Sequence, residues 1–356
     1  MHIPDGYLSP ATCGVLAAAM VPVWSTAATR AKRVVKSRYA PLMAVGAAYS
    51  FLVMMFNVPI PDGTTAHAVG GVLIACLLGP WAAVISISVA LAIQALFFGD
   101  GGVLAFGANA FNMAFVMPFV GYAVYRTLTR QTSLTARRRA IAAGLGGYVG
   151  LNAAALVTAI EFGLQPELFH TADGTPLYAP FHLSQTIPAM ALAHLTVAGF
   201  VEFALTAGVV AYLQRANLPL LRINHARVPE AGSAMPHRPL GWRWAFYGLG
   251  AMLALTPLGL LAPGGAFGED APQDLDLARY HLAAVPQGLH DYTGWWSHTV
   301  LDGYGFSGGS HERAGYLLSA LVGCLAVATA IALMIALVRV VSRAGGDDAE
   351  QPVLAP

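Results

Sequence analysis

HAVGGVLIACLL, at residues 67–78, is the apolar stretch on which the fold of this chain depends. Gly79-Pro80 follows it directly and ends any helix formed there. At about 1.5 Å per residue, a helix of this length is too short to cross the roughly 30 Å hydrocarbon core of a bilayer alone. It must nevertheless cross, or lie buried as a half-helix, because the charges on its two sides fix its direction.

The composition around this stretch is that of a polytopic membrane protein. Of the 356 residues, 56% are hydrophobic and only 10% are charged, whereas soluble domains carry about 25% charged residues. The mean hydropathy is +0.60. Eight further apolar segments are each long enough to cross a bilayer. They lie at about 9–28, 40–57, 81–98, 103–126, 140–162, 186–213, 242–262 and 313–340.

The basic residues indicate which connections share a side of the membrane. Of the 19 Lys and Arg, only Arg279 and Arg313 fall on one side when 67–78 is counted as a crossing, which leaves 17 on the other. Because positive residues accumulate inside, the amino terminus is predicted outside and the carboxyl terminus in the cytoplasm. The sequence therefore predicts nine membrane spans.

A polar, proline-rich connector divides these spans into two groups. We predict an all-α protein with a seven-span bundle at 1–213, a cytoplasmic linker at 214–241 and a two-span unit at 242–343. The second unit carries an outer loop at 263–312, and 344–356 forms a cytoplasmic tail.

The chain opens Met1-His2-Ile3-Pro4, which makes its terminus a candidate chelator. The terminal amine, the His2 backbone nitrogen and the His2 imidazole Nδ1 can close two rings around one cation. A fourth nitrogen would complete a square plane, the geometry typical of Ni(II) or Cu(II). The first ten residues lack Lys and Arg, so we expect no signal peptide and a free amine on Met1. The predicted topology places His67 on the same face, as a candidate fourth ligand.

Several polar residues near these positions are candidates for holding the ligands in place. Asn109 and Asn112 are three residues apart and would share one helix face. They would either fix the amino-terminal arm or join neighbouring helices. Asp5, Thr64 and Thr65 flank the candidate ligands in sequence and belong to the same group.

Other residues are assigned plainer roles. Glu202 lies deep in an apolar span and needs a partner, for which His194 is two turns away; Glu161 is expected near the membrane interface. Solvated positions are expected for the histidines of the outer loops, His170, His182, His281, His290, His298 and His311. Packing positions are expected for Cys13, Cys76 and Cys324.

No catalytic residue is predicted. Neither lysine follows a phosphate-binding loop, so ATP hydrolysis for any active transport must come from another chain. Gly308-Gly309-Ser310-His311 lacks the G-x-S-x-G pattern of a serine hydrolase. An intramembrane hydrolase and a metal-independent scaffold remain as alternatives; no organic cofactor or nucleic acid is expected.

Three motifs resemble the CbiM/NikM family, the membrane substrate-binding subunits of energy-coupling-factor transporters for cobalt and nickel. They are the opening Met1–Pro10, the His67 segment and Gly-Ala-Asn-x-x-Asn-Met at 107–113, and the likeness covers about residues 1–215. Residues 242–340, whose loop contains Ala-Phe-Gly-Glu-Asp at 266–270, resemble the small NikN-like accessory subunit, here fused.

The resemblance implies a seven-helix fold and four nitrogen ligands, supplied by the amine of Met1, two nitrogens of His2 and one of His67. It also implies two partners, a transmembrane coupling subunit (EcfT, NikQ or CbiQ-like) and an ABC-type ATPase (NikO or CbiO-like). Pro4-Asp5 after Met-His-Ile resembles the nickel branch. Ni2+ is therefore the expected cargo, and Co2+ uptake for cobalamin synthesis is the alternative.

Overall fold

The computed structural model describes residues 1–37, 39–61, 63–225, 243–262, 264–306, 308 and 311–344. The predicted linker from residue 226 onward, the tail from residue 345 onward and Ser310 lie outside these described residues. The regular secondary structure within them is almost entirely helical. The α-helices are α1 (Pro10–Arg30), α2 (Lys32–Lys36), α3 (Pro41–Met54), α4 (Gly71–Leu78), α5 (Pro80–Ile93), α6 (Phe106–Asn109), α7 (Met117–Thr129), α8 (Arg137–Gly163), α9 (Gln165–Leu168), α10 (Leu183–Ala193), α11 (Gly199–Ala216), α12 (Leu218–Arg222), α13 (Arg243–Leu255), α14 (Gln287–Tyr292) and α15 (Glu312–Ala344).

Shorter or modified turns complete the helices. Three π-helical stretches continue α5, join α6 to α7 and join α10 to α11; they are Gln94–Phe98, Ala110–Val116 and His194–Ala198. The 3-10 turns are Thr256–Leu261, Pro272–Asp274 and Asp302–Tyr304. Two strands of two residues each, β1 (Val58–Pro59) and β2 (Thr65–Ala66), pair antiparallel ahead of His67. Buried π-helical turns often occur at functional sites, because they redirect side chains within a helix.

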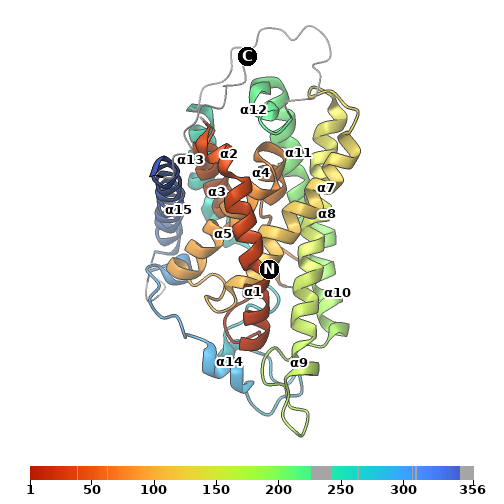
Figure 1. Cartoon of the computed structure of the whole chain (residues 1–356). Coiled ribbons are helices and arrows are strands. Elements are labelled where there is room, and N and C mark those ends of the chain that lie inside the picture. The colour runs from red at the N-terminus through yellow and green to blue at the C-terminus, as the bar shows by residue number, and fades with distance from the viewer. Residues whose placement is uncertain are drawn as a thin grey trace.

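The helices form an elongated bundle (Figure 1). Helix α8 packs against α7, α10 and α11, and α3 packs against α5, α13 and α15. The outer-loop segments with α9 and α14 lie at one end, and α12 lies at the other (Figure 1). The chain begins inside this bundle, since the side chains of Met1, His2 and Ile3 are all buried.

Six of the described helical segments are long and apolar enough to cross a membrane. They are Pro10–Arg30, Pro80–Phe98, Arg137–Leu168, Leu183–Ala216, Trp244–Leu261 and Glu312–Val341. The other three expected crossings are shorter or composite. α3 has 14 residues, α4 has eight, and the segment expected at 103–126 consists of α6, a π-helical stretch and α7. The protein is an all-helical, multi-pass membrane protein.

Helix α4 is a buried half-helix, one of the two arrangements allowed by its length. Its eight residues rise about 12 Å, and seven of them are buried. Pro80 begins α5 directly after Gly79, so the chain turns sharply at the Gly-Pro pair. Residues 67–70, between β2 and α4, thus run in irregular backbone through the interior, which a membrane protein tolerates only where the protein itself satisfies the backbone.

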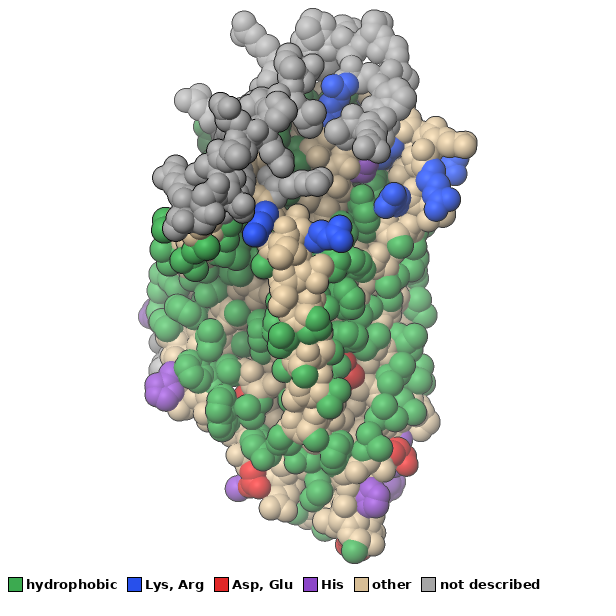
Figure 2. All heavy atoms as spheres, viewed as in Figure 1, with side chains coloured by type: hydrophobic (Ala, Val, Ile, Leu, Met, Phe, Trp, Pro, Cys, Tyr) green, Lys and Arg blue, Asp and Glu red, His purple; other side chains and the backbone are tan. Residues whose placement is uncertain are grey.

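The surface charges separate along the bundle. Lys and Arg side chains gather at the end that carries α12 and the α7–α8 connection, and acidic and histidine side chains appear at the other end (Figure 2). Hydrophobic side chains cover the surface between them (Figure 2). The segregation predicted from the basic residues is therefore present in the fold.

Candidate metal centre

The amino-terminal arm is held inside the bundle by its own backbone. Asn109 accepts a hydrogen bond from the Ile3 amide at 2.8 Å and donates one to the Ile3 carbonyl at 3.1 Å. The Gly102 amide also donates to the Ile3 carbonyl, at 2.8 Å. The Asn109 side chain therefore makes the pair of hydrogen bonds to the Ile3 backbone that a neighbouring β-strand would make.

Asp5 anchors the arm from its other side. Its carboxylate accepts hydrogen bonds from the amides of Val103, Leu104 and Ala105 at 2.9–3.1 Å, immediately before α6. A carboxylate is favoured there, because the first amides of a helix have no partner within the helix. Gly102 permits this approach, since a Cβ at that position would lie 1.9 Å from Asp5 Oδ1.

His2 and His67 meet in the interior. The Nδ1 of His2 and the Nε2 of His67 are 3.2 Å apart, although the residues are separated by 65 positions in sequence. The other ring nitrogen of His67, Nδ1, lies 3.0 Å from the Ala68 carbonyl. Since a carbonyl only accepts, the proton of a neutral His67 belongs on Nδ1, and Nε2 presents its lone pair to His2.

Acceptor atoms surround the His2 ring. Gln94 Oε1 lies 3.3 Å from its Nε2, and Asp100 Oδ1 lies 3.2 Å from its Nδ1. Together with the lone pair of His67, these groups offer no donor to the two ring nitrogens. The arrangement suits a cation between the rings, or a proton in its place.

Gln94 and Asp100 are themselves tied to the second half of the chain. Gln94 Nε2 donates to Asp100 Oδ2 at 3.1 Å and to the Tyr304 hydroxyl at 2.9 Å, and this hydroxyl donates to the same carboxylate oxygen. Metal-bound histidines usually need such a partner to fix the ring and its tautomer. Gln94 would do so for His2 by accepting a hydrogen bond from the protonated Nε2.

The terminal amine also meets the second half of the chain. The nitrogen of Met1 lies 3.1 Å from Glu269 Oε1, in the Ala-Phe-Gly-Glu-Asp motif. The side chain of Met1 is buried, whereas that of Glu269 is 22% exposed. Nearby, the Tyr7 hydroxyl donates to the Asp270 carbonyl at 2.8 Å. The amine is therefore in an ion pair in this structure.

The remaining predicted positions divide between two places. Thr65 is buried in β2, where its amide donates to the Gly265 carbonyl at 3.1 Å, and the Thr64 carbonyl accepts from Ile60. Both support the hairpin that leads to His67. Asn112 instead contacts α8, donating to Glu161 at 2.6 Å and to Thr158 at 3.0 Å. Of the two predicted asparagines, one holds the arm and the other joins helices.

The two isolated acids are both buried within the protein. Glu161, at 7% exposure, contacts Asn112. Glu202 does not pair with the predicted His194 and instead accepts hydrogen bonds from the amides of Val69 and Gly70. His194 Nδ1 lies 2.8 Å from the Met190 carbonyl.

Burial sets the protonation of His67, which lies ahead of α4 and outside the six long helices. The side chain is only 5% exposed, and the positively charged form of a buried imidazole is costly. The ring is therefore neutral near pH 7, the form that binds metals.

Four residues of this centre were missed by the sequence reasoning, namely Gln94, Asp100, Glu269 and Tyr304. Gln94 carried a usable signal, because a lone amide in an apolar span needs an internal partner. Glu269 and Tyr304 are more than 200 positions from the arm, and no local pattern connects them to it.

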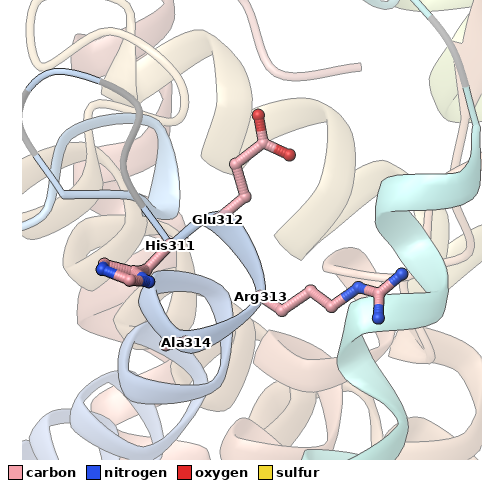
Figure 3. A pocket seen from close by; sticks show the side chains of 4 residues that line it. All are labelled: His311, Glu312, Arg313 and Ala314. Atoms are coloured by element: carbon pink, nitrogen blue, oxygen red, sulfur yellow. The ribbon is translucent and has the colours of Figure 1, made fainter.

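A surface hollow at the start of α15 is unrelated to this centre. It is lined by His311, Glu312, Arg313 and Ala314. The side chains of Glu312 and Arg313 point away from one another there (Figure 3). No group of ligands converges in it.

Comparison with known proteins gives a consistent result over the whole chain. Residues 2–220 match the family model CbiM, described as the cobalt uptake substrate-specific transmembrane region. The chain is 49% identical to the fused nickel transport protein NikMN of Rhodobacter capsulatus, over 97% of this chain and all of that protein. It is 46% identical to the probable fused nickel transport protein LarMN of Lactiplantibacillus plantarum, over 91% and 94% of the two chains.

Solved structures give a match over the first part of the chain. A truncated transition metal transporter is 60% identical and superposes with a TM-score of 0.56, covering 60% of this chain and 98% of that chain. A second transition metal transporter is 57% identical with a TM-score of 0.57, covering 64% and 100%.

Proposed function

This chain belongs to the CbiM family of substrate-specific transmembrane regions, and from that premise we propose that it captures Ni2+ for an ATP-driven importer. It is a transport subunit and not an enzyme. The proposed ligands are four nitrogens: the amine of Met1, the backbone and imidazole nitrogens of His2, and Nε2 of His67.

One observation carries the proposal, the 3.2 Å approach of His2 Nδ1 to His67 Nε2 in a buried pocket of acceptor atoms. Two such nitrogens with facing lone pairs repel unless a proton or a metal lies between them. Asp5, Asn109 and Gln94 support the proposal, because they fix the arm and the His2 ring in place. Asp100 and Glu269 add negative charge, which favours a divalent cation.

The choice of nickel rests on the ligands and on the relatives. Amine, amide and imidazole nitrogens in a plane suit Ni(II), and the two whole-chain relatives are named nickel transport proteins. Co2+ is the second candidate, since the matching family is described by cobalt uptake. A competition titration that compares the Kd of Ni2+ with the Kd of Co2+ at this site distinguishes the two candidate cargo ions.

The proposal includes an arrangement in the cell. The arm, β1–β2 and the loop carrying Glu269 would face outward, and the basic end of the bundle would face the cytoplasm. Residues 1–213 would form a seven-span metal-binding bundle, and residues 242–343 a two-span accessory unit. A coupling subunit and an ATPase would complete the importer, because this sequence contains no phosphate-binding loop.

An extension of the terminus tests the four-nitrogen site. Adding three glycines before Met1 keeps every side chain but moves the free amine out of the chelate rings, whereas one added residue would put His2 in third place, where an amine, two amides and an imidazole can bind Ni2+ in a square plane by themselves. We expect the extended protein to lose stoichiometric, tight Ni2+ binding in calorimetry, whereas the native terminus, verified by intact mass, retains it. His170→Ala removes an exposed loop histidine and serves as the matched control.

Retained tight binding by the extended protein would rule out the terminal amine as a ligand. His67→Ala tests the fourth position separately. It leaves three nitrogens and an open coordination position, so we expect much weaker binding. Unchanged affinity in that variant would remove His67 from the proposed ligand set.

A further inference from the structure

Helix α4 is held at both ends by one neighbouring segment of the chain. Glu202 of α11 contacts the backbone just before α4, and Asn224, two residues after α12, contacts the backbone at its end. Helix α12 follows α11 after a single residue, Asn217. Helix α4 begins four residues after His67. The segment that contains α11 and α12 therefore contacts α4 at both of its ends.

Glu202 is a fully buried carboxylate whose donors are mostly backbone. Its Oε2 accepts from the amides of Val69 and Gly70, each at 2.9 Å, and its Oε1 accepts from the Thr206 hydroxyl at 3.2 Å. A carboxylate buried this deeply is costly unless donors compensate it. Here the compensation also orders the segment that follows His67.

The other groups of this segment are equally constrained. The Ser50 hydroxyl donates to the Val69 carbonyl at 2.7 Å, and the Ala68 carbonyl faces the His67 ring. Gly70 has φ +75°, and a Cβ there would lie 2.4 Å from the Tyr49 ring. Charge-assisted bonds from two adjacent amides to Glu202 hold this turn in one conformation, and the turn determines where the His67 ring lies.

The far end of α4 is held by an amide. Asn224 Nδ2 donates to the carbonyls of Ala75 and Cys76, at 3.2 and 3.4 Å, and to the Tyr122 hydroxyl at 3.1 Å. The last carbonyls of a helix lack partners within it, and that of Ala75 accepts from the Gly79 amide as well as from Asn224. Because α4 is only about 12 Å long, the two contacts fix the position of the whole helix between the metal centre and the α12 end of the bundle.

We propose that Glu202 is a positioning residue for metal capture, acting through the backbone of Val69 and Gly70 to hold His67 against His2. Asn224 fixes the opposite end, so α4 and His67 move together with α11–α12. This inference rests on the proposed function, because it assigns His67 to a bound Ni2+.

A double-mutant cycle in the full-length protein tests the role of Glu202. We expect Glu202→Ala to raise the Kd for Ni2+ about 10- to 100-fold, the usual range for residues that orient metal ligands. If Glu202 acts through His67, the same substitution adds no further loss in a His67→Ala background. An equal loss in both backgrounds would overturn the positioning role.

Two variants separate positioning from general stabilisation. Glu202→Gln keeps a carbonyl oxygen for the two amides while its NH2 faces the Thr206 hydroxyl, so we expect it to recover most of the affinity and the visible absorption band of bound Ni2+. Asn224→Ala removes a partly buried contact at the other end of the same helix, and we expect near-native affinity. Equal losses of affinity in Asn224→Ala and Glu202→Ala would show that α4 is merely destabilised.

Hydrogen exchange of the metal-free protein gives a readout that does not depend on nickel. Glu202→Ala should speed exchange of the Val69 and Gly70 amides but not of the last turn of α4, and Asn224→Ala should do the reverse. Unchanged exchange at 69–70 in Glu202→Ala would overturn the inference by itself. Failure of the wild type to bind Ni2+ would instead refute the proposed function, and with it the positioning role.

Discussion

Asn109→Ala is the substitution whose effect on metal capture follows most directly from the structure. Asn109 makes two hydrogen bonds to the backbone of Ile3, which is fully buried. It touches none of the proposed ligand atoms in these contacts. Any effect on Ni2+ binding must therefore come from the position of the arm.

The magnitude follows from which backbone group is left unpaired. The Ile3 carbonyl keeps the Gly102 amide at 2.8 Å, so only the Ile3 amide loses its partner. An unsatisfied buried donor costs about 1–3 kcal/mol. If this cost displaces the amino-terminal arm from the bundle in the metal-free protein, binding of Ni2+ must supply the free energy that returns the arm to its place. At about 1.4 kcal/mol per tenfold, the Kd for Ni2+ rises about 5- to 140-fold.

Calorimetry with a competing chelator at constant pH measures this change. Asn109→Asp keeps an acceptor for the Ile3 amide but places a second oxygen opposite the Ile3 carbonyl, so it should not recover the affinity lost in Asn109→Ala. Asn112→Ala is the matched control on the same helix. It removes bonds to Glu161 and Thr158, so it should lower the melting temperature and leave the Kd unchanged. Equal Kd values for Asn109→Ala and Asn112→Ala would refute the reasoning.

Four other predictions concern the same centre. Ni2+ binding should weaken as the pH falls, because the amine and the His2 amide must release protons to bind the ion. Calorimetry in buffers of different ionisation enthalpy should count more than one proton released per ion, and release of none would contradict it. Gln94→Leu should raise the Kd for Ni2+ about 10- to 100-fold, because it leaves the His2 Nε2 proton unpaired. Tyr304→Phe should raise the Kd less, because Gln94 and Asp100 stay hydrogen-bonded to each other. Gly102→Ala should abolish binding without loss of helical circular dichroism, since its Cβ would lie 1.9 Å from Asp5 Oδ1, whereas Gly14→Ala, with open space around it, should bind normally. Glu269→Ala should speed acetylation of the Met1 amine relative to Lys32 and Lys36, and an unchanged relative rate would show that the ion pair does not protect the amine.

Much of the fold was accessible from the sequence because hydrocarbon imposes simple rules. Length, hydropathy and the asymmetry of basic residues located the long helices and separated the two ends of the bundle. The length of 67–78 also allowed a half-helix, which is what α4 forms. Its partners were not predictable, because Glu202 and Asn224 lie more than 120 positions away and pair with backbone groups that look alike in any sequence.

The candidate site was predictable where the chemistry is local. Met1 and His2 form chelate rings through adjacent bonds, and Asn109 is conspicuous as an amide in an apolar span. Asn112 has the same sequence signal, yet its contacts are with α8. Spacing places two residues on one face of a helix but does not show which neighbour each of them meets. The π-helical stretch Ala110–Val116 intervenes between them and alters their relative direction.

The contacts around Met1 connect the amino-terminal arm to the two-span unit proposed at 242–343. A terminal amine can bind a metal only after losing its proton, and here the amine is paired with Glu269 of the second part. The same part supplies Tyr304 to Gln94 and Asp100, which contact His2. Glu269 is partly exposed, so it can turn to solvent when an ion replaces the proton it faces. Residues 264–306 therefore contact the Met1 amine directly through Glu269, and the His2 ring indirectly through Gln94 and Asp100.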